Sequence, residues 1–233
     1  MSGTVFIISA PSGSGKTTLA NMLRESVPDL LFSVSYTTRK KRGSEQDGRE
    51  YYFVDRQEFE RMLTGDEFLE HANVYGNYYG TAKRFLKEAK NAKKDLLLDI
   101  DVQGEEQVKR KIPAALSIFI LPPSREILES RLRARGYAEK IDDKEANVQG
   151  RLLAASKEIE KYRNYDYILV NDQLDRSIDQ LKAIVLSERL RHSGEPLSDE
   201  YQRLWKLAEP CLQKNAGGRV RQVIESFASP AVP

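Results

Sequence analysis

Short apolar runs alternate with long charged segments along most of the chain. Four of these runs occupy residues 5–9, 96–100, 116–121 and 167–170, and each ends at charged or turn-forming residues. The segments between them repeat apolar residues at helical spacing, as with Leu19, Met22 and Leu23 after the first run. Buried strands that alternate with helices predict an α/β fold, with a parallel core sheet flanked by helices.

Three segments depart from this alternation. Residues 35–83 are rich in tyrosine and glycine and contain short irregular strands. Residues 124–164 are charged and helical, with a break at Gly136. The C-terminal segment follows a linker and contains two amphipathic stretches. The predicted organisation is therefore a core from residues 1–34, 84–123 and 165–193, an inserted sub-domain at 35–83, a helical region at 124–164 and a helical C-terminal extension at 194–233.

Composition excludes several classes of protein. The 37 Lys and Arg residues nearly balance 35 Asp and Glu, which leaves a net charge of +2. This balance argues against a basic nucleic-acid arm and a polybasic membrane anchor, and no apolar run approaches the ~20 residues of a transmembrane helix. The single cysteine, Cys211, fits a reducing compartment. We therefore expect a cytoplasmic protein that binds neither nucleic acid nor membrane.

A phosphate-binding loop follows the first apolar run. Apart from Ala10 in the first glycine position, residues 10–17 fit the pattern G-x-x-x-x-G-K-[ST]. Glycines let successive backbone N–H groups point at phosphate oxygens, and the following helix adds the positive end of its dipole. Lys16 would reach the β- and γ-phosphates, and the Thr17 hydroxyl would ligate Mg²⁺. A turn that merely connects strand to helix would not require this order of strand, loop, Lys-Thr and helix.

The second apolar run ends in carboxylates at Asp99 and Asp101. In a nucleotide-binding fold such a strand lies beside the phosphate loop and directs acidic groups toward Mg²⁺ or its water shell. Many strands end in aspartate, so this pattern supports the phosphate loop without standing alone.

Arginines gather in two places. Residues 39–42 read Arg-Lys-Lys-Arg and have several tyrosines nearby, a set suited to gripping a phosphate, although a charged run can also be a solvated surface. Arg131 and Arg135 are four positions apart and share one helix face, and Arg151 on the next helix could converge with them. Such a group is suited to neutralising a phosphoryl group during its transfer.

Together these residues resemble the guanylate kinase family from about Val5 to Leu190. The matching motifs occupy residues 9–18, 33–39, 42–45, 48–51, 67–70, 76–80, 98–104, 122–124 and 170–172. The resemblance implies a P-loop NTPase fold in which residues 35–83 form a mixed-sheet GMP-binding sub-domain and residues 124–164 a lid. It also implies the Mg²⁺-dependent transfer of the γ-phosphoryl group of ATP to GMP or dGMP, giving ADP and GDP, in purine nucleotide metabolism.

The resemblance implies a role for each matching residue. ATP would be bound by Ala10, Pro11, Ser12, Gly13, Ser14, Gly15, Lys16, Thr17, Thr18 and, on its adenine side, Asn171. GMP would be bound by Ser35, Arg39, Arg42, Glu45, Tyr51, Glu70, Tyr79, Thr81 and Asp99. Catalysis would use Lys16, Arg39, Arg131, Arg135 and Arg151, and Mg²⁺ would bind Thr17 and Asp101, directly or through water. Glu70 can accept hydrogen bonds from N1–H and the 2-amino group of guanine, a donor pair that adenine lacks.

Two other interpretations compete with a GMP kinase. Some guanylate-kinase-like domains are binding modules without catalysis, but those lack a functional phosphate loop, whereas Lys16 and Thr17 are present here. A kinase for another nucleoside monophosphate would not need the pair of Ser35 and Glu70. The chain also departs from the family pattern. The turn within 136–150 is longer than usual. The extension has no counterpart in the family's common core, which suggests an appendage on the core or on a second subunit and leaves a homo-oligomer open.

Overall fold

The computed structural model describes residues 3–74, 76–138, 144–194, 196 and 198–228. Its larger sheet is parallel and has the strand order β2-β7-β1-β8-β9. The strands are β1 (Val5–Ser9), β2 (Leu30–Phe32), β7 (Asp95–Asp99), β8 (Leu116–Leu121) and β9 (Tyr167–Val170). Four of them match the predicted apolar runs to within a residue, whereas β2 was missed. It is a three-residue edge strand that is only partly buried, so it carries little periodic signal.

The chain divides into two compact units. Unit 1 comprises the chain up to Ile7 together with residues 28–116, and unit 2 comprises residues 8–27 and the chain from Ser117 onward. The predicted sub-domain at 35–83 therefore lies wholly within unit 1. The predicted helical region at 124–164 and the C-terminal extension lie within unit 2.

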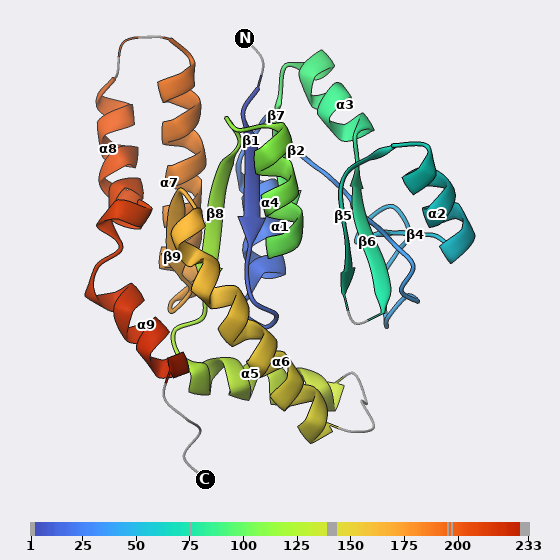
Figure 1. Ribbon diagram of the computed structural model, residues 1–233. Coiled ribbons are helices and arrows are strands. Elements are labelled where there is room, and N and C mark those ends of the chain that lie inside the picture. Colours follow the sequence, from blue (N-terminus) through green and yellow to red (C-terminus); the bar gives the residue numbers. More distant parts are fainter. Residues whose placement is uncertain (1–2, 75, 139–143, 195, 197, 229–233) are drawn as a thin grey trace. The chain divides into compact units, whose positions relative to one another are not determined.

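Unit 1 contains a second, mixed sheet with the order β4-β3-β6-β5. Its strands are β3 (Tyr36–Thr37), β4 (Tyr52–Phe53), β5 (Phe68–Val74) and β6 (Asn77–Ala82), and the helices of the unit are α2 (Arg56–Thr64), α3 (Arg84–Ala92) and α4 (Val102–Lys111) (Figure 1). Strands β5 and β6 form an antiparallel hairpin, whereas β3 pairs with β4 in parallel. This hairpin matters for the site because Glu70 of β5 pairs with Thr81 of β6.

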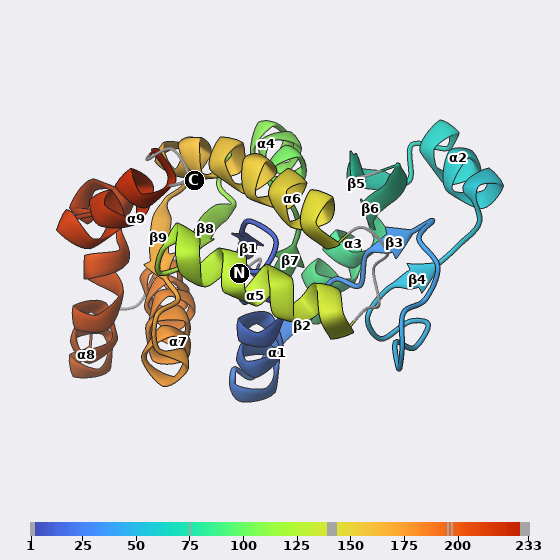
Figure 2. The ribbon, with the colours of Figure 1, turned by 90° about the horizontal axis from the view of Figure 1, so that it is seen from below.

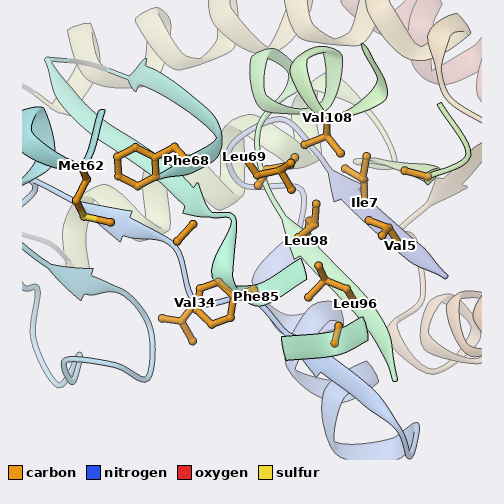
Figure 3. Close-up of a cluster of buried hydrophobic side chains, with 14 of the residues drawn as sticks. Val5, Ile7, Val34, Met62, Phe68, Leu69, Phe85, Leu96, Leu98 and Val108 are labelled. Carbon is orange, nitrogen blue, oxygen red and sulfur yellow. The ribbon is translucent and has the colours of Figure 1, made fainter. Parts of the chain in front are cut away.

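One apolar core runs through unit 1. Figure 3 shows Val5 and Ile7 of β1, Leu96 and Leu98 of β7 and Val108 of α4 in the same cluster as Phe68 and Leu69 of β5. Phe68 also stacks on Phe59 of α2, with ring centroids 4.5 Å apart. Full burial of each such side chain is worth about 1.5–3 kcal/mol, so the strand that carries Glu70 is firmly attached to the rest of its unit.

Unit 2 contains the helices α1 (Lys16–Ser26), α5 (Arg125–Ala138), α6 (Lys144–Ile159) and α7 (Leu174–His192), with a 3₁₀ turn η1 (Glu160–Asn164). The predicted helix break at Gly136 is wrong, because Gly136 lies inside α5. An isolated glycine costs a helix only about 1 kcal/mol relative to alanine, which packing of α5 can offset. The unusually long turn that the sequence suggested falls partly on residues 139–143, which lie outside the described residues.

The C-terminal extension folds onto unit 2. It comprises α8 (Asp199–Ala208), two short turns, η2 (Glu209–Cys211) and η3 (Gln213–Asn215), and α9 (Gly218–Ala228). Helix α8 runs beside α7, and α9 reaches α5 and α6 (Figures 1 and 2). Between them, Leu212 forms an isolated bridge to Tyr167 of β9, and the Gln213 N–H donates to the Asp166 carbonyl over 2.9 Å. The extension thus pairs with an edge strand of the sheet.

Candidate active site

The phosphate loop of unit 2 connects β1 to α1. Gly13 and Gly15 have φ angles of 91° and 92°, a region that side chains disfavour, and the Ser14 N–H closes a turn onto the Pro11 carbonyl over 3.1 Å. Helix α1 then starts at Lys16 without a side-chain cap and without an acidic residue in its first turn. An uncapped helix start that lacks negative charge is a favourable place for an anion.

Asn171, at the end of β9, fixes the shape of this loop. Its Nδ2 donates a hydrogen bond to the Ser14 carbonyl over 2.8 Å. A Cβ on Gly15 would lie only 2.3 Å from the same Nδ2, so glycine is required there for close approach as well as for its φ angle. A Cβ on Gly13 would lie 3.0 Å from Leu128 and 3.1 Å from Leu132 of α5. The loop is therefore packed tightly from two sides.

Arg131 of α5 lies against the same loop. Its Nη1 is 3.4 Å from the Ser14 carbonyl and its Nη2 is 3.4 Å from the Asn171 carbonyl, and burial lowers the pKa of this guanidinium. No carboxylate pairs with Arg131 among the described residues. Arg133, by contrast, pairs with Glu129 at 2.7 Å and with Glu145 at 2.5 Å. A partly buried cation that is held by carbonyls and has no carboxylate partner within the described part of the chain is suited to receiving an anion.

Two other predicted arginines belong to unit 2. Arg151 of α6 approaches the loop, because its Nη1 lies 3.4 Å from the Ser12 hydroxyl. Arg135 lies on α5, but its side chain is outside the described part of the structure. The structure therefore brings Arg131, Arg151 and Asn171 together at the phosphate loop.

A second cationic group lies in unit 1, around Arg39. This side chain is only 9% exposed and makes a bidentate ion pair with Glu45, with N···O distances of 2.8 and 3.0 Å. Burial alone would lower the pKa of Arg39, but the hydrogen bonds and charge of Glu45 outweigh it and raise that pKa. The guanidinium also lies 5.3 Å from the centroid of the Tyr51 ring, and Tyr51 packs edge-on against Tyr79 at 5.8 Å.

Glu45 organises the loop that follows β3. Besides pairing with Arg39, it accepts a hydrogen bond from the Arg42 backbone N–H over 2.8 Å. Burial would raise the pKa of Glu45, but these hydrogen bonds reverse the effect and hold that pKa below its usual value. The Arg42 side chain is exposed. Four of the predicted phosphate-binding residues of this unit thus form one connected cluster, namely Arg39, Glu45, Tyr51 and Tyr79.

A polar, buried group lies on the neighbouring strands of unit 1. Ser35 Oγ is 3.4 Å from Thr81 Oγ1, and Thr81 pairs in register with Glu70, whose residue is only 3% exposed. A Cβ on Gly104 of α4 would lie 2.5 Å from Glu70 Oε2, so the carboxylate rests directly on the helix backbone. Buried carboxylates and hydroxyls form directional acceptors and donors for a base edge.

The two aspartates at the end of β7 have different surroundings. Asp99 is partly exposed at the strand end, whereas Asp101 caps α4, because its Oδ1 accepts a hydrogen bond from the Gly104 N–H over 2.8 Å. Within the described residues, no group of three His, Cys, Asp or Glu side chains could hold a metal ion by itself. Hydroxyl and carboxylate oxygens, such as those of Thr17 in unit 2 and Asp101 in unit 1, are nonetheless donor types that Mg²⁺ prefers.

Comparison with known proteins places this arrangement in a family. A family model for guanylate kinase matches residues 2–188. The chain belongs to the guanylate kinase family. Guanylate kinase homologues are nucleoside monophosphate kinases, which are phosphotransferases.

Individual relatives agree with the guanylate kinase assignment. The guanylate kinase of Koribacter versatilis (strain Ellin345) is 54% identical over 233 residues, covering 100% of this chain and 99% of that protein. That of Nitrosospira multiformis (strain ATCC 25196 / NCIMB 11849 / C 71) is 50% identical over 189 residues, covering 81% and 88%. A crystal structure of guanylate kinase from Anaplasma phagocytophilum is similar with a TM-score of 0.67 and 32% identity, covering 90% of this chain and 96% of that one. Among the described helices, none is both long and apolar enough to cross a membrane.

The sequence did not reveal how α4 holds β5, the strand that carries Glu70. The Gln107 side chain donates to the His71 carbonyl over 2.7 Å and accepts from the His71 N–H over 3.2 Å, and Lys111 Nζ donates to the Leu69 carbonyl. With Gly104, these residues form one face of α4, at positions i, i+3 and i+7. That spacing was visible in the sequence, but its partner strand was not.

Proposed function

We propose that the chain transfers the γ-phosphoryl group of ATP to GMP or dGMP, giving ADP and GDP, as a step of purine nucleotide metabolism. One observation carries this proposal. The chain holds two arginine groups, one against the phosphate loop of unit 2 and one beside the mixed sheet of unit 1. A kinase with two phosphorylated substrates needs such a group for each of them.

ATP is the proposed ligand of unit 2. Residues 10–18 would surround its phosphates with backbone N–H groups, and Lys16 would bridge the β- and γ-phosphates. Arg131, Arg135 and Arg151 would neutralise charge on the transferred group, which is supported for Arg131 by its lack of a carboxylate partner within the described residues. Asn171 would lie on the adenine side and offer its Oδ1 as an acceptor, since its Nδ2 donates to the Ser14 carbonyl.

GMP is the proposed ligand of unit 1. Glu70 would accept the N1–H and 2-amino hydrogens of guanine, with Ser35, Thr81 and Asp99 contributing further polar contacts. The monophosphate would be bound by side chains around the ion pair of Arg39 with Glu45, namely Arg39, Arg42, Tyr51 and Tyr79. Adenine would present a hydrogen-bond acceptor to the buried carboxylate, which would then remain unsatisfied at a cost of about 1–3 kcal/mol or more.

Mg²⁺ is the proposed cofactor. The Thr17 hydroxyl would ligate it directly, and Asp101 would contact its water shell, because one Asp101 oxygen is already engaged in capping α4. When bound, Mg²⁺ supplies charge neutralisation for the ATP phosphates. Removing divalent cations with a chelator should abolish transfer, and adding Mg²⁺ back should restore it.

An acceptor panel tests the proposal. ADP formation would be followed with ATP and Mg²⁺ while GMP, dGMP, AMP, CMP or UMP is supplied in turn. We expect turnover with GMP and dGMP and at most traces with the other three. Equal rates with AMP would contradict the role of Glu70, and the absence of ADP formation with GMP would contradict a kinase of this specificity.

A further inference from the structure

Helix α9 of the C-terminal extension caps the first turn of α5. The Ser226 Oγ accepts a hydrogen bond from the Arg125 N–H over 3.1 Å and itself donates to the Val223 carbonyl over 2.6 Å. Arg125 is the first residue of α5, and the first N–H groups of a helix have no partner within it. A hydroxyl that is 101 residues away in sequence therefore completes the start of the helix that carries Arg131.

The same helix enters the apolar contact between α5 and α6. Phe227 packs against a buried cluster formed by two residues of α5 and three of α6, namely Leu128, Leu132, Val148, Leu152 and Ala155. Leu128 and Leu132 are also the side chains that pack under Gly13 of the phosphate loop. Phe227 and the loop thus both contact one small cluster, in which a change of packing is felt throughout.

A third contact of α9 lies beside Asn171. Arg219 pairs with Asp172 over 2.8 Å, and Asp172 is only 20% exposed. The neighbouring Asn171 uses its side chain to hold the Ser14 carbonyl and its own carbonyl to contact Arg131. Arg219 therefore restrains Asp172, which directly follows Asn171, the residue that shapes the phosphate loop.

These three contacts coincide with the elements that hold the phosphate loop. Helix α5 supplies Arg131, α6 supplies Arg151, and the end of β9 supplies Asn171. We propose that α9 is a positioning element for the ATP phosphates, in which Ser226, Phe227 and Arg219 act through Arg131, Arg151 and Asn171. This inference rests on the proposed function and extends it to a segment beyond the family match, which ends at residue 188.

Point variants of the full-length chain test the positioning role. Phe227→Ala should raise the KM for ATP and lower kcat, and so should the double variant Ser226→Ala/Arg219→Ala. In each variant the two effects should reduce kcat/KM for ATP about 10-fold, because small displacements of positioning groups are costly. The KM for GMP should stay within about twofold, since the residues proposed to bind GMP belong to unit 1. Phe227→Leu and Ser226→Thr, which keep the apolar contact and the hydroxyl, should restore most of the loss.

Two control variants separate positioning from stability. Arg221→Ala removes an exposed arginine of α9 and should behave as wild type. Tyr201→Ala removes a buried residue of α8, which packs on α7, so it should lower Tm without raising the KM for ATP. The proposal is overturned if the α9 variants lower Tm as Tyr201→Ala does while their KM for ATP equals that of wild type.

Calorimetric titration with a non-hydrolysable ATP analogue and Mg²⁺ keeps this inference separate from the proposed function. If wild type failed to phosphorylate GMP, the proposed acceptor would be wrong, yet Kd for the analogue could still be compared between wild type and the α9 variants. A Kd that rises severalfold in Phe227→Ala but not in Arg221→Ala would support positioning by α9. Equal Kd values together with equal kinetics would refute it.

Discussion

Two arginines of α5, two positions apart, have opposite surroundings. Arg131 is partly buried and donates to the carbonyls of Ser14 and Asn171, with no carboxylate partner among the described residues, whereas Arg133 is 41% exposed and pairs with two glutamates. We expect Arg131→Ala to lower kcat about 10²- to 10³-fold, as does the loss of one preorganised donor to a transition state. Arg133→Ala should leave kcat within about twofold, because it removes exposed ion pairs, each of which contributes at most about 1 kcal/mol to folding stability.

Steady-state kinetics with ATP and GMP, with Tm measured alongside, would check this pair. A small effect of Arg131→Ala, or an equal loss of kcat in both variants, would contradict the assignment of Arg131 to the transferred phosphoryl group.

The ion pair between Arg39 and Glu45 predicts a pH-dependent contribution to stability. The pKa of Glu45 is lower in the folded protein than in the unfolded chain, so ionised Glu45 stabilises the fold above its unfolded pKa. This contribution is lost as the pH falls through the lower, folded pKa. Urea unfolding of wild type and Glu45→Gln should differ by about 1 kcal/mol near neutral pH, with the variant less stable. The difference should shrink in strongly acidic buffer, and a constant difference would contradict the assigned charge state.

At the residue scale, the sequence could predict which side chains are candidates but not what they contact. The spacing of Lys16 and Thr17 after two glycines predicts a phosphate loop because backbone chemistry demands those residue types there. The hydrogen bond of Asn171 to Ser14 joins residues 157 positions apart, and no local pattern encodes it. The close approach of Gly104 to Glu70 was likewise hidden, since it depends on how α4 meets β5.

At the scale of elements, two helix glycines provide a matched pair. Gly104 of α4 touches the Glu70 carboxylate, whereas a Cβ on Gly150 of α6 would have no neighbour within 4 Å. Gly104→Ala should displace the carboxylate, which is the movable end of a side chain, and raise the KM for GMP about 10-fold with little change in the KM for ATP. Gly150→Ala should raise the free energy of unfolding by about 0.5–1 kcal/mol and leave both KM values unchanged.

Acceptor and donor titrations on both variants would test this. If Gly104→Ala raised the KM for ATP as much as that for GMP, the helix face of α4 would not act through Glu70.

Elements were predictable where periodicity and burial coincide. The runs that became β1, β8 and β9 are almost wholly buried, so their apolar composition is dictated by the core. Strands β3 and β4 have two residues each and depend on tertiary pairing, so the sequence could indicate only short irregular strands within residues 35–83. The predicted helix break at Gly136 was wrong because a helix tolerates one glycine when its other residues pack well.

For the whole molecule, a net charge of +2 conceals where charge is left uncompensated. Arg39, Arg133 and Arg191 are each paired with a glutamate, and Arg131 is paired with none among the described residues. A count of charges cannot separate these cases, because compensation depends on which side chains meet in the fold. The proposed assignment of one nucleotide to each unit is therefore better tested by ligand binding than by charge composition.

Amide hydrogen exchange provides that test for the full-length chain. A non-hydrolysable ATP analogue with Mg²⁺ should slow exchange in unit 2, at residues 10–17 and around Arg131, because a ligand stabilises the elements that bind it. GMP alone should instead slow exchange in unit 1, at residues 35–54 and 68–82. These two patterns follow from the assignment of one nucleotide to each unit and do not depend on turnover. If GMP protected the phosphate loop and left the strand of Glu70 unchanged, the mixed sheet would not be the acceptor site.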